Sequence, residues 1–114
     1  MPAQAITNND SKFHKATLDN TATASSFTGP RDGKTLWVRL ETDVSVYVQV
    51  GDDVVQGTTD LSTDDENQGP LLAYNTWTQI PAHPRDTSGF KEAPVVFMQA
   101  SASADIRYRW TREA

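Results

Sequence analysis

Few residues of this sequence belong to the types that carry catalysis. It has two histidines, His14 in a polar N-terminal segment and His83 in a proline-containing segment, and no cysteines. Nucleophilic catalysis requires a serine, threonine or lysine beside a base and an oxyanion donor, and no G-x-S-x-G motif is present. Zinc requires several His, Cys or carboxylate ligands at short spacing. We therefore expect no enzyme activity, no catalytic residues, no cofactor and no metal.

Acidic side chains are concentrated in one part of the chain. Seven of them lie between Asp43 and Glu66, where there is no Lys or Arg. Residues 52–70 read as one long acidic loop, and loops of this length are often functional, so we interpret it as an interaction loop. Calcium is the alternative, because this loop offers hard oxygen ligands, although their spacing does not match an EF-hand loop: Asp60, Asp64, Asp65, Glu66 and Asn67.

Aromatic side chains are the remaining candidates for binding. Trp37 and Tyr47 alternate with aliphatic residues, which predicts that they lie on faces opposite the aliphatic stripes and are partly exposed. Exposed aromatic rings on a sheet suit either sugar stacking or burial by another protein chain. In the alternative interpretation the aromatic residues form the core face. We expect Trp77 and Trp110 to lie in the core or at its rim.

The segment that must position these side chains is Lys34–Gly51. Apolar residues alternate with others over 36–40 and again over 44–50, and only Thr42 and Asp43 separate the two runs. This pattern predicts two half-buried strands, most simply a hairpin. Each strand needs a second layer to cover its aliphatic side.

Other segments extend this pattern. Residues 15–28 are rich in threonine and predict an edge strand or two short strands, and residues 29–33 predict a turn. Residues 94–100 form an apolar run that predicts a buried strand, and 105–111 place Ile106, Tyr108 and Trp110 on one face, so we expect a C-terminal hairpin. The chain is therefore predicted to be all-β, a small β-sandwich or jelly roll of about seven to eight antiparallel strands.

Composition limits the classes of partner. The chain has 114 residues, 37% hydrophobic, with a net charge of −5. The acidic balance argues against nucleic-acid binding, and no apolar run is long enough for a membrane span or a signal peptide, so we expect synthesis in the cytoplasm. Residues 1–14 are too polar to fold alone, which predicts an N-terminal arm followed by a single β-sandwich domain over 15–114.

One set of residues comes from the central strands, the short strand before Trp77 and the C-terminal pair: Val38, Arg39, Thr42, Asp43, Val48, Gly51, Leu72, Ala73, Gln99, Ala100, Ser101 and Ala102. In type and order these residues resemble those of small β-rich structural proteins of tailed bacteriophages. The similarity covers roughly residues 24–111, and Asp105 stands near the position where those proteins have a glycine.

This resemblance implies a virion structural protein, most simply a capsid decoration (cement) protein that binds the major capsid protein on the outer capsid surface as a homotrimer. A tail or neck accessory subunit, a carbohydrate-binding module and a small hydrolase with converging carboxylates are the alternatives. We expect protein interfaces at apolar groups of the arm, at outward aromatic rings and at C-terminal arginines: Ile6, Phe13, Trp37, Tyr47, Arg107, Arg109 and Arg112.

Overall fold

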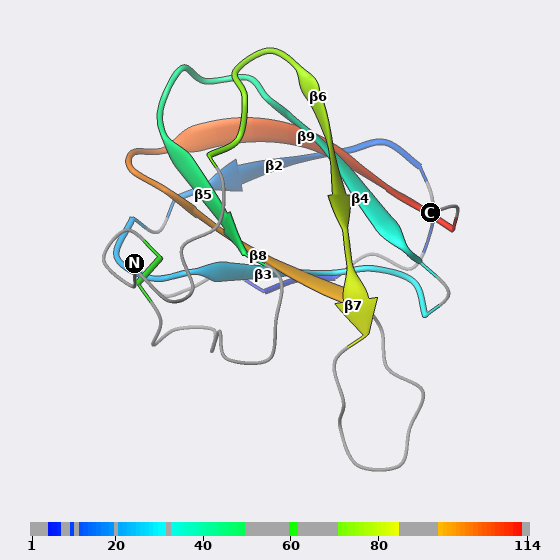
Figure 1. Ribbon diagram of the computed structural model, residues 1–114. Coiled ribbons are helices and arrows are strands. Elements are labelled where there is room, and N and C mark those ends of the chain that lie inside the picture. The colour runs from blue at the N-terminus through cyan, green and yellow to red at the C-terminus, as the bar shows by residue number, and fades with distance from the viewer. Residues whose placement is uncertain are drawn as a thin grey trace.

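The fold consists of two β-sheets packed face to face (Figure 1). The computed structural model describes residues 5–7, 10, 12–19, 21–31, 33–49, 60–61, 71–84 and 94–112, and for residues 83 and 84 the backbone alone. These ranges contain no helix, and their strands are β1 (Ala5–Thr7), β2 (His14–Leu18), β3 (Ser25–Thr28), β4 (Thr35–Leu40), β5 (Val46–Gln49), β6 (Trp77–Pro81), β7 (His83–Pro84), β8 (Pro94–Ala100) and β9 (Ala104–Thr111). The predicted all-β class and sandwich architecture are confirmed.

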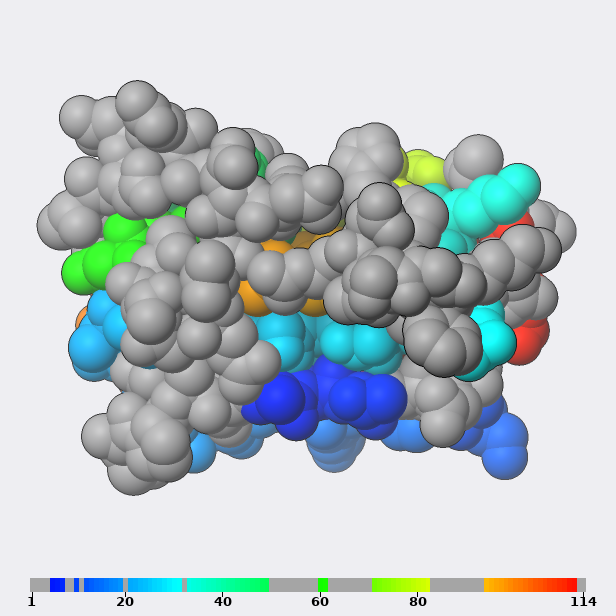
Figure 2. All heavy atoms as spheres, turned by 90° about the horizontal axis from the view of Figure 1, so that it is seen from below, coloured from blue at the N-terminus to red at the C-terminus, as the bar shows by residue number. Residues whose placement is uncertain are grey.

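The first sheet has the strand order β1-β3-β8-β5, with β7 also paired to β8, and the second has the order β2-β9-β4-β6. All pairs between these strands are antiparallel except β1 with β3, which is parallel and aligns Ile6 with Phe27. Figure 2 shows β1 at the surface, alongside β3. This parallel edge strand departs from the predicted fully antiparallel fold.

The aliphatic stripes of the sequence form the core between the sheets. Leu36, Val38 and Leu40 of β4 are fully buried, and so is Val46 of β5. The aliphatic side of each strand is therefore the inner side, and the interpretation that placed the aromatic side of β4 and β5 in the core is wrong. Because side chains alternate along a strand, Trp37 of β4 is directed to the outer face of its sheet.

The two predicted hairpins are both wrong. β4 lies in the second sheet and β5 in the first, so residues 41–45 carry the chain across the sandwich. β8 and β9 are likewise in different sheets, and residues 101–103 connect them. In each pair both strands direct their apolar sides at the same core from opposite layers. A hairpin and a connection between two sheets have the same local alternation of apolar and polar residues. This alternation indicates which residues share a side of a strand but does not indicate the strand's pairing partner.

Two further sequence predictions are confirmed. The threonine-rich region 15–28 supplies two short strands, β2 at the edge of the second sheet and β3 inside the first. The predicted turn at 29–33 is present, and within it the backbone N–H of Gly33 donates to the carbonyl of Pro30 at 2.8 Å.

Strand β8 is buried on both sides, as its continuous apolar sequence predicted. Val96 and Met98 face the main core, whereas Phe97 packs with Ala24 and Leu61 in a second, smaller cluster outside the first sheet. Gln99, which is 1% exposed, lies on β8 two residues after Phe97. Its Oε1 accepts a hydrogen bond from the backbone N–H of Leu61 at 2.6 Å. Its Nε2 donates to the carbonyl of Thr21 at 2.9 Å and to Asp60 Oδ1 at 2.8 Å.

Replacing Gln99 by methionine is expected to lower the free energy of unfolding by about 1–3 kcal/mol, because it leaves the buried backbone N–H of Leu61 without its partner. Denaturant unfolding checks this value. Gln49→Met on β5 is the control, with an expected change of about 0.5 kcal/mol or less. Equal costs for the two variants would contradict the role assigned to Gln99.

Candidate functional site

The outer face of the second sheet carries aromatic and arginine side chains on neighbouring strands. In the antiparallel register of β4 with β9, Trp37 is opposite Arg109 and Arg39 is opposite Arg107. In the register of β4 with β6, Arg39 is also opposite Trp77. Alternation directs all five side chains to the same side, because their neighbours along each strand are more deeply buried.

Phe13 adds a third aromatic ring to this face from the segment before β2. Its ring centroid lies 5.5 Å from that of Trp77, and the rings are tilted by 58°. Since β2 and β6 are the two edges of this sheet, the contact requires the chain before β2 to fold over the outer face. Phe13 is nevertheless 62% exposed. We name this surface the aromatic–arginine face; its residues are Phe13, Trp37, Trp77, Arg39, Arg107 and Arg109.

The aromatic rings enclose a surface groove of about 310 Å³, lined by Phe13, Trp37, Trp77, Arg109 and Thr111. The Arg109 guanidinium lies 5.1 Å from the Phe13 ring centroid, and the Arg39 guanidinium lies 5.3 Å from that of Trp77. These distances are within the range of cation–π contacts, in which a cation is attracted to the face of an aromatic ring. Three aromatic rings beside cationic groups are suited to binding another molecule by stacking and burial.

One carboxylate, Glu41, lies between two of these arginines. Arg107 Nε donates to Glu41 Oε1 at 3.0 Å, and Arg39 Nη2 donates to Oε2 at 3.2 Å. Burial raises the pKa of Glu41, but the hydrogen bonds and positive charges of Arg107 and Arg39 more than offset it, so the pKa is lowered from its ordinary value. The carboxylate is therefore ionised at neutral pH and links β4 to β9.

The Glu41 link predicts a pH dependence of stability. Because folding lowers this pKa, the stabilisation is fully present above the ordinary value of 4.5 and is lost as the pH falls through the lower folded-state value. We expect Glu41→Gln to be less stable than the wild type at neutral pH, with a difference that shrinks below pH 4.5. Thermal melts at a series of pH values measure the difference in stability, and Asp43→Asn is the matched charge control. A difference in melting temperature between wild type and Glu41→Gln that does not change with pH would contradict the prediction.

The predicted interface residues fall into two groups. Phe13, Trp37, Arg107 and Arg109 are together on the aromatic–arginine face. The other three lie elsewhere: Ile6 is on β1 and packs against the main core, Tyr47 is on β5 against the second cluster, and Arg112 follows β9 and is exposed.

Trp77 and Arg39 belong to this face, although the sequence did not single them out as interface residues. The alternation of Trp77, Thr78, Gln79 and Ile80 contains the signal for Trp77, because an inward Ile80 requires an outward Gln79 and Trp77. Arg39 is two positions after Trp37 and therefore shares its side of β4.

The remaining residues that could carry chemistry are His14 and the candidate calcium ligands. His14 Nε2 lies 2.7 Å from Asp10 Oδ1, and the histidine ring stacks on Tyr108. Within the described ranges no three His, Cys, Asp or Glu side chains are placed to hold a metal ion. Of the candidate calcium ligands, Asp60 accepts a hydrogen bond from Gln99, and Asp64, Asp65, Glu66 and Asn67 lie outside the described residues.

Comparison of the chain with protein-family models, with curated proteins and with solved structures found no match. None of the described segments is a helix that is long and apolar enough to cross a membrane.

Proposed function

We propose that this chain is a bacteriophage virion structural protein of the capsid decoration type, which docks on the outer capsid surface through its aromatic–arginine face. In this proposal the major capsid protein and further copies of the chain, as a homotrimer, are its partners. The chain contributes adhesion and stabilises the shell through protein contacts. The resemblance to small phage structural proteins motivates the choice of partner, and the outer face of the second sheet supports the mode of binding.

The observation that carries the proposal is the composition of that face. Trp, Phe and Arg are the residue types enriched at the centres of protein interfaces, where a few of them supply most of the binding energy. Trp77 is 36% exposed and Phe13 62% exposed, so their rings are accessible to a partner. Exposing such rings is unfavourable in a lone subunit, and a partner surface would remove them from water.

Co-sedimentation of the purified chain with capsids that lack it tests this proposal. Capsids of the phage that encodes the chain are expected to bind it saturably and to become more resistant to heat. Light scattering of the free chain measures whether it forms the homotrimer. If the chain binds isolated tails or necks and does not bind capsids, it is a tail or neck subunit and not a capsid decoration protein. Failure to bind any of these particles would contradict the proposal.

A second function is favoured by one specific observation, the groove of about 310 Å³ with Phe13, Trp37 and Trp77 in its lining. This volume is at the lower end of small-ligand sites, and aromatic rings stack on the apolar faces of sugars. The second candidate is therefore a carbohydrate-binding module. A glycan array with the wild type and Trp37→Ala tests it: binding that depends on Trp37 would support it, and absence of signal on all glycans would contradict it.

A further inference from the structure

The aromatic–arginine face holds positive charges in an unfavourable arrangement. Lys15 of β2 is directly opposite Arg107 of β9, and Arg107 is directly opposite Arg39 of β4. Three cations therefore lie in one row across three neighbouring strands. Like charges directly opposite each other destabilise a sheet. Glu41 offsets part of this repulsion, and a second carboxylate at this sheet face, Asp105, accepts a hydrogen bond from Thr17 Oγ1.

The two arginines of this row retain hydrogen-bonding capacity. Arg107 uses its Nε and Arg39 uses one Nη for Glu41, and within the described part of the chain their other guanidinium nitrogens make no hydrogen bond. Arg39 Nε is buried without a partner among those residues. The side chains of Arg39 and Arg107 are 29% and 40% exposed, so a ligand can reach them. Arginine donates in a planar fork that matches a carboxylate, which distinguishes it from lysine.

The distance between the groove and the arginine pair matches the distance between alternate residues of an extended peptide. Trp37 and Arg39 are two residues apart on one strand, or roughly 7 Å at about 3.3 Å per residue. A partner segment in an extended conformation places its own alternate side chains at the same interval. It can therefore direct an apolar side chain into the groove and a carboxylate to the arginines at the same time.

We propose that the docking segment of the partner is an extended acidic peptide, in which an apolar side chain fills the groove and a carboxylate two residues away binds Arg39 and Arg107. This inference rests on the proposed function and names the chemistry of the partner. The attraction between the two arginines and the carboxylate of the partner peptide makes peptide binding depend on salt, since exposed charges are screened within about 10 Å at 0.1 M.

A random copolymer of glutamate and tyrosine is the probe for this proposal. Its binding to the intact chain is measured by fluorescence at low and at high salt, with polyglutamate and polygalacturonate as comparison polymers. We expect the copolymer to bind more tightly than either comparison polymer. The double variant Arg39→Gln/Arg107→Gln is expected to weaken binding by about 10-fold or more.

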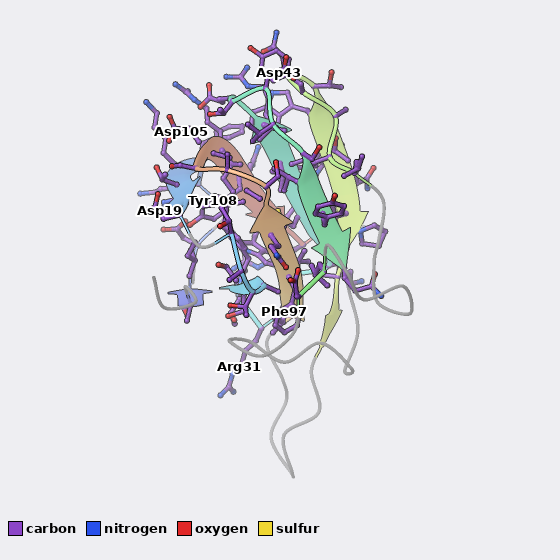
Figure 3. The ribbon with its side chains drawn as sticks, turned by 90° about the vertical axis from the view of Figure 1, so that its left-hand side faces the viewer. Asp19, Arg31, Asp43, Phe97, Asp105 and Tyr108 are labelled. Carbon is purple, nitrogen blue, oxygen red and sulfur yellow. The ribbon has the colours of Figure 1, made fainter. Side chains whose placement is uncertain are left out.

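The matched control is Arg31→Gln/Arg112→Gln, which removes the same charge from two exposed arginines. Arg31 lies at the end of the sandwich opposite Asp43 (Figure 3). This control is expected to weaken copolymer binding by about 2-fold or less. Equal losses in the two double variants would overturn the proposal, as would absence of copolymer binding at low salt. Tighter binding of polygalacturonate would also overturn it and would indicate an acidic glycan.

The melting temperature of the free protein separates binding from a structural role. Because Arg39→Gln/Arg107→Gln removes both the repulsion within the row and the two ion pairs with Glu41, it is expected to lower the melting temperature no more than Glu41→Gln does, and a larger fall would mean that the arginines serve the fold. Capsid binding that is unaffected by this double variant would refute the inference while leaving the proposed function intact. Copolymer binding without any capsid binding would refute the proposed function alone.

Discussion

Replacing Trp110 by alanine is expected to lower the free energy of unfolding by about 3–5 kcal/mol, which is the usual cost of truncating a fully buried tryptophan. Trp110 is 1% exposed and is among the largest buried side chains of the described residues. It lies near the end of β9, opposite Leu36 of β4, so its loss opens the core at one end of the sandwich. Domains of this size have a total stability of about 5–15 kcal/mol, so this variant loses a substantial part of it. Thermal and denaturant unfolding measure the effect.

Gly29 provides an internal test of the same packing. A Cβ atom at this position would collide with the Trp110 indole ring. We therefore expect Gly29→Ala to cost about 1–3 kcal/mol in the wild type, as for other overpacked cores, and much less when Trp110 is already alanine. Trp110→Phe, which keeps an aromatic ring and removes the buried indole N–H that has no partner among the described residues, is expected to cost less than Trp110→Ala. Additive costs in the Gly29 and Trp110 double variant would contradict the packing described.

The largest functional effect is expected from Trp77. Under the proposed function, Trp77→Ala should weaken capsid binding by about 30-fold or more, which corresponds to a hot-spot loss of about 2 kcal/mol. The reason is that Trp77 contacts both Phe13 and Arg39, so its removal disrupts the centre of the aromatic–arginine face. Quantitative co-sedimentation measures the affinity, and circular dichroism checks that the variant is folded.

Leu71→Ala is the matched control for Trp77→Ala. Leu71 is 58% exposed and pairs with Tyr47 of β5, so it belongs to the first sheet. Its removal is expected to change capsid affinity by about 2-fold or less. If Leu71→Ala weakens binding as much as Trp77→Ala does, the docking surface is not confined to the second sheet.

Alternation along the chain predicted which residues share a side of each strand, but it left open which side is buried. The period of two groups Leu36 with Val38, and Ile106 with Trp110, and the structure shows that these sides form the core. The pairing partners could not be predicted in the same way. Both expected hairpins are corners between sheets, because pairing depends on contacts that are distant in the sequence and a strand's pattern does not record them.

For the candidate site, the sequence could predict which residues share a side of one strand. Trp37, Arg107 and Arg109 follow from alternation in β4 and β9. Their combination with Trp77 depends on β6 pairing with β4, which no local pattern reports. Tyr47 shares the alternation signal of Trp37 but lies in the other sheet, since the chain changes sheets between β4 and β5. The separation of these two aromatic residues is a consequence of topology alone.

Oxidative footprinting of the chain, free and bound to capsids, tests most directly whether the aromatic–arginine face is the docking surface. Trp37, Trp77 and Phe13 line the groove and are expected to be oxidised in the free chain and protected on the capsid. Trp110 is buried and should react little in either state. Tyr47, on the first sheet, should react equally in both. Protection of Tyr47 without protection of Trp37 and Trp77 would contradict the account.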